Sequence, residues 1–171
     1  EFRRVLFRSN QYQQAYERMG EETTLKCRRL WDGSSYLPNS TLPMLWINGT
    51  NDPHFYLPVW QKSYRAAKGP QILCVKPGIK HTHPDGWNPS EIYAFSDSIV
   101  KGGIPLAQIT DSGCDKKRAW ISYSCRAEIV QAEFIYTMDA DKQWNDRNWI
   151  CRFADLDQEK QKAVATLPEN V

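Results

Sequence analysis

The sequence lacks several features that would assign it to a broad class. It has no initiator Met, no secretory apolar core and no apolar run long enough to span a bilayer. Its five cysteines show no CxxC spacing, which argues against a zinc ribbon or a thioredoxin-like site. This odd number permits two disulfides with one free thiol, or five reduced thiols, so cysteine usage does not indicate a compartment.

The first nine residues, EFRRVLFRS, have the periodicity of neither a helix nor a strand. One DNA sequence that would encode this stretch, GAG TTC AGA CGT GTG CTC TTC CGA TCT, resembles a common sequencing-library adapter read in frame. We therefore interpret residues 1–9 as an adapter-derived artefact, and we expect the sequence to start in mid-gene. The alternative is a genuine basic arm that binds nucleic acid or a membrane.

Without these nine residues the charge balance is neutral. The chain has 22 basic and 20 acidic residues, a formal net charge of +2, and the first nine residues supply all of that excess. We therefore expect no nucleic-acid partner and no membrane partner. The apolar content of 41% and the seven Trp residues indicate a packed globular protein. Nothing in the composition indicates an oligomeric state.

Residues 10–103 alternate between short apolar runs and segments with helical spacing. The runs MLWING and QILCV are typical of buried strands, and LPVWQKSYRAAKG and NPSEIYAFSDSIVKGG of helices. In the latter helix we expect Asn88 as the N-cap, Pro89 at N1 and Glu91 at N3. Upstream, we expect a helix that ends near Gly20 and then a surface connection over 27–43. This order predicts an α/β fold with a parallel sheet covered by helices.

Residues 104–171 have a different pattern of apolar and polar residues. Short, partly alternating segments rich in β-branched and aromatic residues are separated by turn signals such as DSGCDKK and DADKQWNDRN. This spacing predicts a small antiparallel sandwich-like module. Because few strands precede the last residue, we expect this module to be truncated.

Two loops after the predicted strands carry the residues best suited to catalysis. Asp52 follows MLWING, and His81 and His83 follow QILCV. Ligands of open α/β sheets bind at the carboxyl ends of the strands, so both loops lie at the functional edge. There the Asp could orient a His that acts as a general base. Alternatively, Asp52 is only a turn residue and the histidines are only hydrogen-bonded loop residues.

The stretch HTHPD offers a competing interpretation, because H-x-H-x-D is a zinc-ligand spacing in metallo-β-lactamase-like sites. Such a site needs further His ligands, and only His54 remains in the chain, while position 86 is Gly. We therefore expect no metal and no cofactor, and we keep a metallohydrolase only as a lesser alternative.

From about residue 30 to residue 100, the sequence resembles the C-terminal half of a serine α/β-hydrolase. It is most similar to bacterial members related to acetylxylan esterases, dienelactone hydrolases and prolyl-oligopeptidase-like peptidases, in which a PxLWxxGTND strand supplies the acid and an xxHxHxxGWxPxEIxxF segment supplies the base. The resemblance implies Asp52 as the triad acid and His81 as the triad base, with His83 as the alternative base. The tail from residue 132 onward resembles a β-sandwich appendage. The resemblance also favours a secreted or periplasmic location.

The nucleophile of that family is absent from the sequence. It sits on a G-x-S-x-G elbow before the acid and the base, and no such motif occurs here. The most similar stretch is DGSSY, with Ser34 and Ser35, which lies in the loop before the predicted strand that precedes Asp52. We therefore expect a fragment of a serine hydrolase. Its substrate is expected to be an ester, such as an acylated sugar or a similar small-molecule or polysaccharide-linked ester, or a peptide bond. By itself, the fragment is expected to be inactive.

The alternative from another class is a non-catalytic carbohydrate-binding protein or pseudo-hydrolase. Five aromatic residues of the tail could form a sugar-binding platform or could simply be core: Trp120, Tyr123, Tyr136, Trp144 and Trp149. In the DPHFYLP stretch, Phe55 and Tyr56 are expected to form apolar walls beside Asp52.

Overall fold

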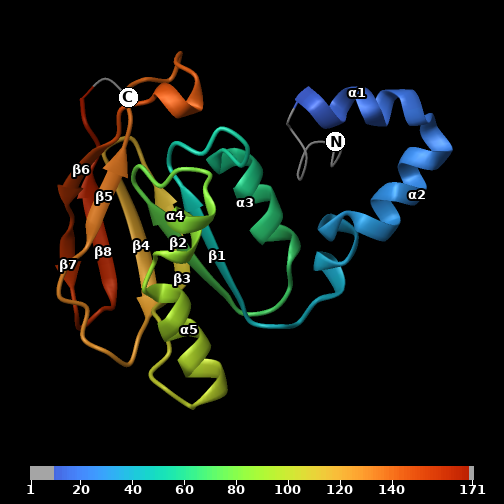
Figure 1. Ribbon diagram of the computed structural model, residues 1–171. Coiled ribbons are helices and arrows are strands. Elements are labelled where there is room, and N and C mark those ends of the chain that lie inside the picture. Colours follow the sequence, from blue (N-terminus) through green and yellow to red (C-terminus); the bar gives the residue numbers. More distant parts are fainter. Residues whose placement is uncertain (1–9, 170–171) are drawn as a thin grey trace.

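The computed structural model describes residues 10–169. The first nine residues, interpreted as translated adapter, lie outside the described range. The fold is mixed α/β, with a short parallel two-stranded sheet flanked by helices and an antiparallel four-stranded sheet (Figure 1). The helices are α1 (Asn10–Met19), α2 (Glu21–Trp31), α3 (Leu57–Ala66), α4 (His83–Trp87) and α5 (Glu91–Val100). The strands are β1 (Met44–Gly49), β2 (Gln71–Lys76), β3 (Gln108–Cys114), β4 (Arg118–Ser124), β5 (Glu133–Tyr136), β6 (Ile150–Phe153), β7 (Asp155–Asp157) and β8 (Lys162–Thr166).

Helices α1 and α2 form an arm that projects from the rest of the molecule (Figure 1). They meet at Gly20, whose φ of 75° is accessible to glycine at little cost. The expected surface connection over 27–43 is wrong at its start, because α2 continues to Trp31 and is followed by two short 3-10 turns, η2 (Gly33–Ser35) and η3 (Leu37–Asn39). Glu21 and Glu22 in the first turn and Arg28 and Arg29 in the last turn complement the helix dipole, which favours this extra length.

Strands β1 and β2 pair in parallel, with Met44 opposite Gln71 and Gly49 opposite Lys76. This confirms the predicted parallel pair of strands. Helix α3 packs against β1 and buries Val59 and Trp60. Parallel pairing brings the carboxyl ends of both strands to the same edge of the sheet, where the two candidate loops begin.

The start of the last helix differs from the prediction. Ser90 is the N-cap of α5, without a side-chain cap hydrogen bond, and Glu91 is its first residue. Asn88 instead caps the carboxyl end of α4, where its N–H donates to the carbonyl of Asp85. The reason is the unpredicted helix α4, which Thr82 begins by accepting a hydrogen bond from the N–H of Asp85.

The C-terminal strands are antiparallel, as predicted, but they form two sheets. The four-stranded sheet has the order β3-β4-β8-β7, and β5 pairs only with β6. Strand β3 carries a bulge between Ile109 and Asp111 and extends to Cys114, so the expected turn DSGCDKK is shorter than predicted. The core here includes Tyr123, Ala163 and Ala165.

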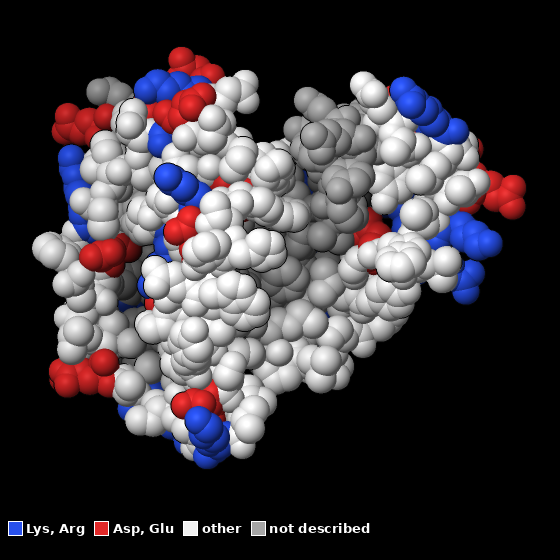
Figure 2. Space-filling model, viewed as in Figure 1, with Lys and Arg blue, Asp and Glu red and all other residues white. Residues whose placement is uncertain are grey.

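All five cysteines are free thiols. Among the helices of residues 10–169, none combines the length and the hydropathy needed to cross a bilayer. On the face drawn in Figure 2, Lys and Arg side chains are interspersed with Asp and Glu side chains.

Candidate active site

The GTND stretch after β1 forms a tight turn. A Cβ atom on residue 49 would lie 2.1 Å from the carbonyl oxygen of Ile79, so Gly49 allows the loop after β2 to approach the end of β1. Thr50 is only 1% exposed, and its N–H donates to the carbonyl of Lys76 at 3.1 Å. The turn therefore joins the ends of both strands.

Asp52 is buried, and both of its carboxylate oxygens accept hydrogen bonds. Oδ1 accepts the backbone N–H groups of His54 at 2.7 Å and Phe55 at 2.8 Å. Oδ2 lies 2.9 Å from Nδ1 of His81. Only 6% of the residue is exposed. Two backbone donors satisfy one oxygen and fix the orientation of the carboxylate, so the other oxygen points at the imidazole ring.

His81 reaches Asp52 through the turn that follows β2. Gly78 adopts a φ of 72°, which reverses the chain, and its N–H donates to Oγ1 of Thr50 at 3.3 Å. Because a buried carboxylate only accepts hydrogen bonds, Nδ1 of His81 is the donor. In the neutral ring Nε2 is then unprotonated and can accept a proton, and the His81 side chain is 44% exposed. This is the arrangement that a general base requires.

Two further rings lie beside His81. The centroid of His54 is 4.5 Å from that of His81, and the centroid of Phe55 is 5.3 Å from it. Phe55 is thus next to the imidazole, consistent with its expected place as a wall. The ring of Tyr56 stacks on that of Trp144, with centroids 5.8 Å apart.

The structure does not bring the HTHPD residues together around a common point. His81 faces Asp52, while the carboxylate of Asp85 accepts the hydroxyl of Thr82 at 2.6 Å. His83 is the exposed first residue of α4. Within residues 10–169, no three His, Cys, Asp or Glu side chains are placed to hold one metal ion. The spacing interpreted as zinc-like is instead the N-terminus of α4.

Neither serine of DGSSY is hydrogen-bonded to His81. The hydroxyl of Ser35 donates to the carbonyl of Arg28 at 3.0 Å, and the N–H of Ser34 donates to the carboxylate of Asp32 at 2.9 Å. Both serines therefore stabilise the turn after α2. Among the described residues, no hydroxyl is hydrogen-bonded to the imidazole of His81.

The five aromatic residues proposed as a platform do not form one surface. Tyr123 and Tyr136 are buried, at 8% and 9% exposure. Trp120 lies over Gly113 in the β3–β4 pair. Trp144 and Trp149 stack with each other at 6.1 Å in the β5–β6 connection, and Trp144 reaches the acid loop. The sequence did not predict this contact. It also did not predict the hydrogen bonds from Nδ2 of Asn51 to carbonyl oxygens of the same connection, for which the only local signal is the place of Asn51 next to Asp52.

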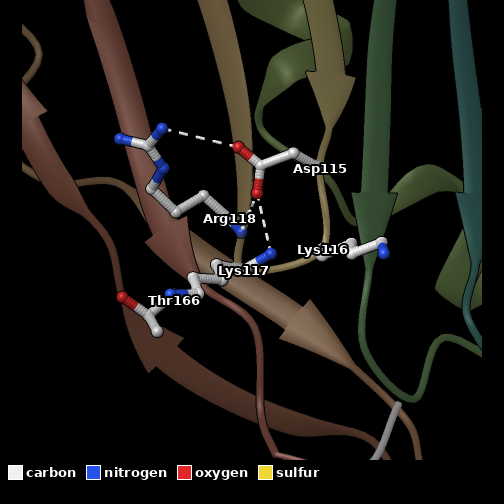
Figure 3. A pocket seen from close by; sticks show the side chains of 5 residues that line it. All are labelled: Asp115, Lys116, Lys117, Arg118 and Thr166. Atoms are coloured by element: carbon white, nitrogen blue, oxygen red, sulfur yellow. Dashed lines mark hydrogen bonds and ion pairs between the residues drawn. The ribbon is translucent and has the colours of Figure 1, made fainter.

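A shallow depression lies at the β3–β4 turn, and neither Asp52 nor His81 lines it. Figure 3 shows its lining residues, Asp115, Lys116, Lys117, Arg118 and Thr166. The Asp115 carboxylate accepts the backbone N–H groups of Lys117 and Arg118, which lower the pKa of Asp115, and it also contacts the Arg118 guanidinium at 3.4 Å. Lys116 points away from Arg118 (Figure 3). The depression is therefore a capped hairpin turn whose cationic groups do not converge.

The sequence matches the model of the PhoPQ-activated pathogenicity-related protein family over residues 5–140. The chain therefore belongs to this family, which is related to α/β-hydrolase folds. No match was found among curated proteins or among solved structures. The family match ends before Trp144.

Proposed function

We propose that this chain carries the acid and the base of a serine hydrolase of the α/β-hydrolase fold. The bond cleaved is an ester, of an acylated sugar or a similar substrate, or a peptide bond. The observation that carries the proposal is the 2.9 Å contact between Nδ1 of His81 and Oδ2 of Asp52 at the ends of two parallel strands. The relation of the family to α/β-hydrolase folds supports the same conclusion.

In this mechanism Nε2 of His81 takes the proton of a serine hydroxyl while the serine oxygen attacks the carbonyl carbon. Asp52 stabilises the imidazolium, which then donates its proton to the leaving group. The acyl-enzyme is hydrolysed by a water molecule that His81 activates in the same way. His83 is not the base in this proposal, because Asp52 contacts His81.

The serine is proposed to lie on a segment outside these 171 residues, since no G-x-S-x-G occurs among them. The purified chain is then expected to hydrolyse no p-nitrophenyl acetate above background and to take no label from a fluorophosphonate probe. Turnover that disappears in His81→Ala and persists in His83→Ala would show that the nucleophile is within these residues.

The source gene tests the enzyme assignment itself. We expect the reading frame upstream of codon 10 to encode a G-x-S-x-G elbow in place of the adapter bases. A start codon followed by genuine codons for residues 1–9 would contradict the proposal, and the chain would then be a pseudo-hydrolase or a binding protein.

A further inference from the structure

A chain of hydrogen bonds connects three segments: the turn after β2 that carries His81 (the base turn, residues 77–82), the turn after β1 that carries Asp52 (the acid turn, residues 50–56), and the connection between β5 and β6. The N–H of Gly78 donates to Oγ1 of Thr50 at 3.3 Å, and the Thr50 hydroxyl donates to Oδ1 of Asn51 at 2.8 Å. Nδ2 of Asn51 then faces three carbonyl oxygens, those of Trp144 at 3.4 Å, Asn145 at 3.2 Å and Arg147 at 2.8 Å. Asn51 is therefore the link between the acid turn and a segment more than ninety residues away in the sequence.

That segment, which we call the Trp144 loop (residues 137–149), is stabilised by its own hydrogen bonds. The carboxylate of Asp139 accepts the backbone and side-chain N–H groups of Asn148 at 2.8 and 3.1 Å, and it pairs with Lys142 at 3.0 Å. The Arg147 guanidinium donates to the carbonyls of Lys142 at 3.1 Å and Ala140 at 2.8 Å. These bonds set the direction of the loop carbonyls independently of Asn51, so they present a preorganised acceptor site.

An aromatic contact joins the Trp144 loop to Tyr56, which follows Asp52 in the sequence, whereas Asn51 precedes it. The ring of Trp144 stacks with Tyr56 at 5.8 Å, and the Arg147 guanidinium lies 4.0 Å from the Trp144 ring centroid. Together with Trp149, these groups pack around the Trp144 ring. The ring therefore links the Trp144 loop to the acid turn and is not an open sugar-binding face.

We propose that Asn51 is a positioning residue that holds the acid turn, and through Thr50 the base turn, against the Trp144 loop. The inference rests on the proposed roles of Asp52 and His81. Asp52 is the next residue in the chain, and its two backbone donors come from His54 and Phe55, which lie between Asn51 and the second attachment at Tyr56. Because both ends of this segment are fixed, the Asp52 carboxylate keeps its orientation toward His81. Small displacements of catalytic groups lower the rate of catalysis strongly.

The test compares Asn51→Ala and Asn51→Asp with the matched control Asn145→Ala. The Asn145 side chain bonds only to Asp146 among the described residues, so its replacement keeps all three carbonyl acceptors. Two signals are followed by NMR in the full chain: amide hydrogen exchange of His54 and Phe55, and the ring nitrogens of His81. We expect exchange at both amides to accelerate by about tenfold or more in Asn51→Ala.

The His81 ring signals are expected to shift in both Asn51 variants and to match wild type in Asn145→Ala. The amide of Tyr123, which donates to the carbonyl of Gln161 in the remote sheet, should be unaffected. Asn51→Asp keeps the side-chain volume but replaces the Nδ2 donor by an oxygen that cannot donate to the three carbonyls. It therefore tests the same hydrogen bonds if Asn51→Ala does not fold. Wild-type exchange and unshifted His81 signals in a folded Asn51 variant would overturn the inference. A wild-type His81 without a proton on Nδ1 would instead contradict the proposed function, and the amide exchange still decides the role of Asn51.

Discussion

The carbonyl oxygen of Ile79 lies 2.1 Å from the position that a Cβ atom on residue 49 would take. The loop that delivers His81 can therefore pass over the end of β1 only because position 49 is glycine. This close approach explains why the acid turn and the base turn share one edge of the sheet.

Gly49→Ala is expected to lower the free energy of unfolding by about 1–3 kcal/mol, because the new methyl group meets backbone rather than a movable side chain. The matched control is Gly86→Ala in α4, where a Cβ would find no atom within 4 Å; alanine is there expected to be neutral or stabilising by up to ~1 kcal/mol. Urea denaturation measures both. Equal effects of the two substitutions would contradict the steric account.

The ion pair between Lys76 and Glu91 joins the last residue of β2 to the first residue of α5. The hydrogen bond from Lys76 to Glu91 raises the pKa of Lys76. Burial alone would raise the pKa of Glu91, but the hydrogen bonds from Lys76 and from its own backbone, with the Lys76 charge, lower the pKa overall. Both side chains are partly exposed, so the pair contributes at most about 1 kcal/mol.

The expected pH dependence follows from these directions. The lowered pKa of Glu91 makes its contribution present above its ordinary value of 4.5 and lost as pH falls through the folded value. The raised pKa of Lys76 makes its contribution present below 10.5 and lost as pH rises through the folded value. The difference in the free energy of unfolding between wild type and Glu91→Gln should therefore be constant between pH 4.5 and pH 10.5 and become smaller outside this range. Asp97→Asn, at an exposed pair with Lys101, is the control with a smaller effect. A difference that grows below pH 4.5 would contradict the account.

The thiols should differ in reactivity because burial raises the pKa of Cys74, with a further increase from Glu91. Cys74 is 6% exposed, whereas Cys114 and Cys151 are exposed. Pulse alkylation with iodoacetamide followed by peptide mapping should therefore modify the exposed Cys114 in the native protein and Cys74 only after unfolding in urea. Equal labelling of Cys74 and Cys114 in the native state would show that β2 is not buried.

Much of the site could be predicted because its determinants are local. The runs MLWING and QILCV are apolar, and the polar stretches directly after them fall at the carboxyl ends of parallel strands. That pattern was sufficient to predict that Asp52 and His81 lie at one edge. The choice between His81 and His83 needed the family resemblance, because both histidines follow the same strand.

The features that the sequence did not predict depend on contacts between residues that are distant in the chain. Asn51 binds carbonyls near residue 145, and backbone acceptors leave no pattern in the side-chain sequence. The Ser90 N-cap was missed because Asn88 is also a good capping residue, and only the presence of α4 assigns it to the other end of a helix. The division of the C-terminal strands into two sheets likewise follows from which edges pair, which strand propensity does not specify.

The most direct test of the account is the tautomer of His81, measured by ¹⁵N NMR of the ring nitrogens in labelled protein and assigned by its loss in His81→Gln. His83 is the internal reference, because no described residue accepts a hydrogen bond from its ring. The account predicts that neutral His81 carries its proton on Nδ1, where Asp52 accepts it, and leaves Nε2 as the basic atom. A proton on Nε2, or ring signals that equal those of His83, would show that Asp52 and His81 do not form a catalytic pair.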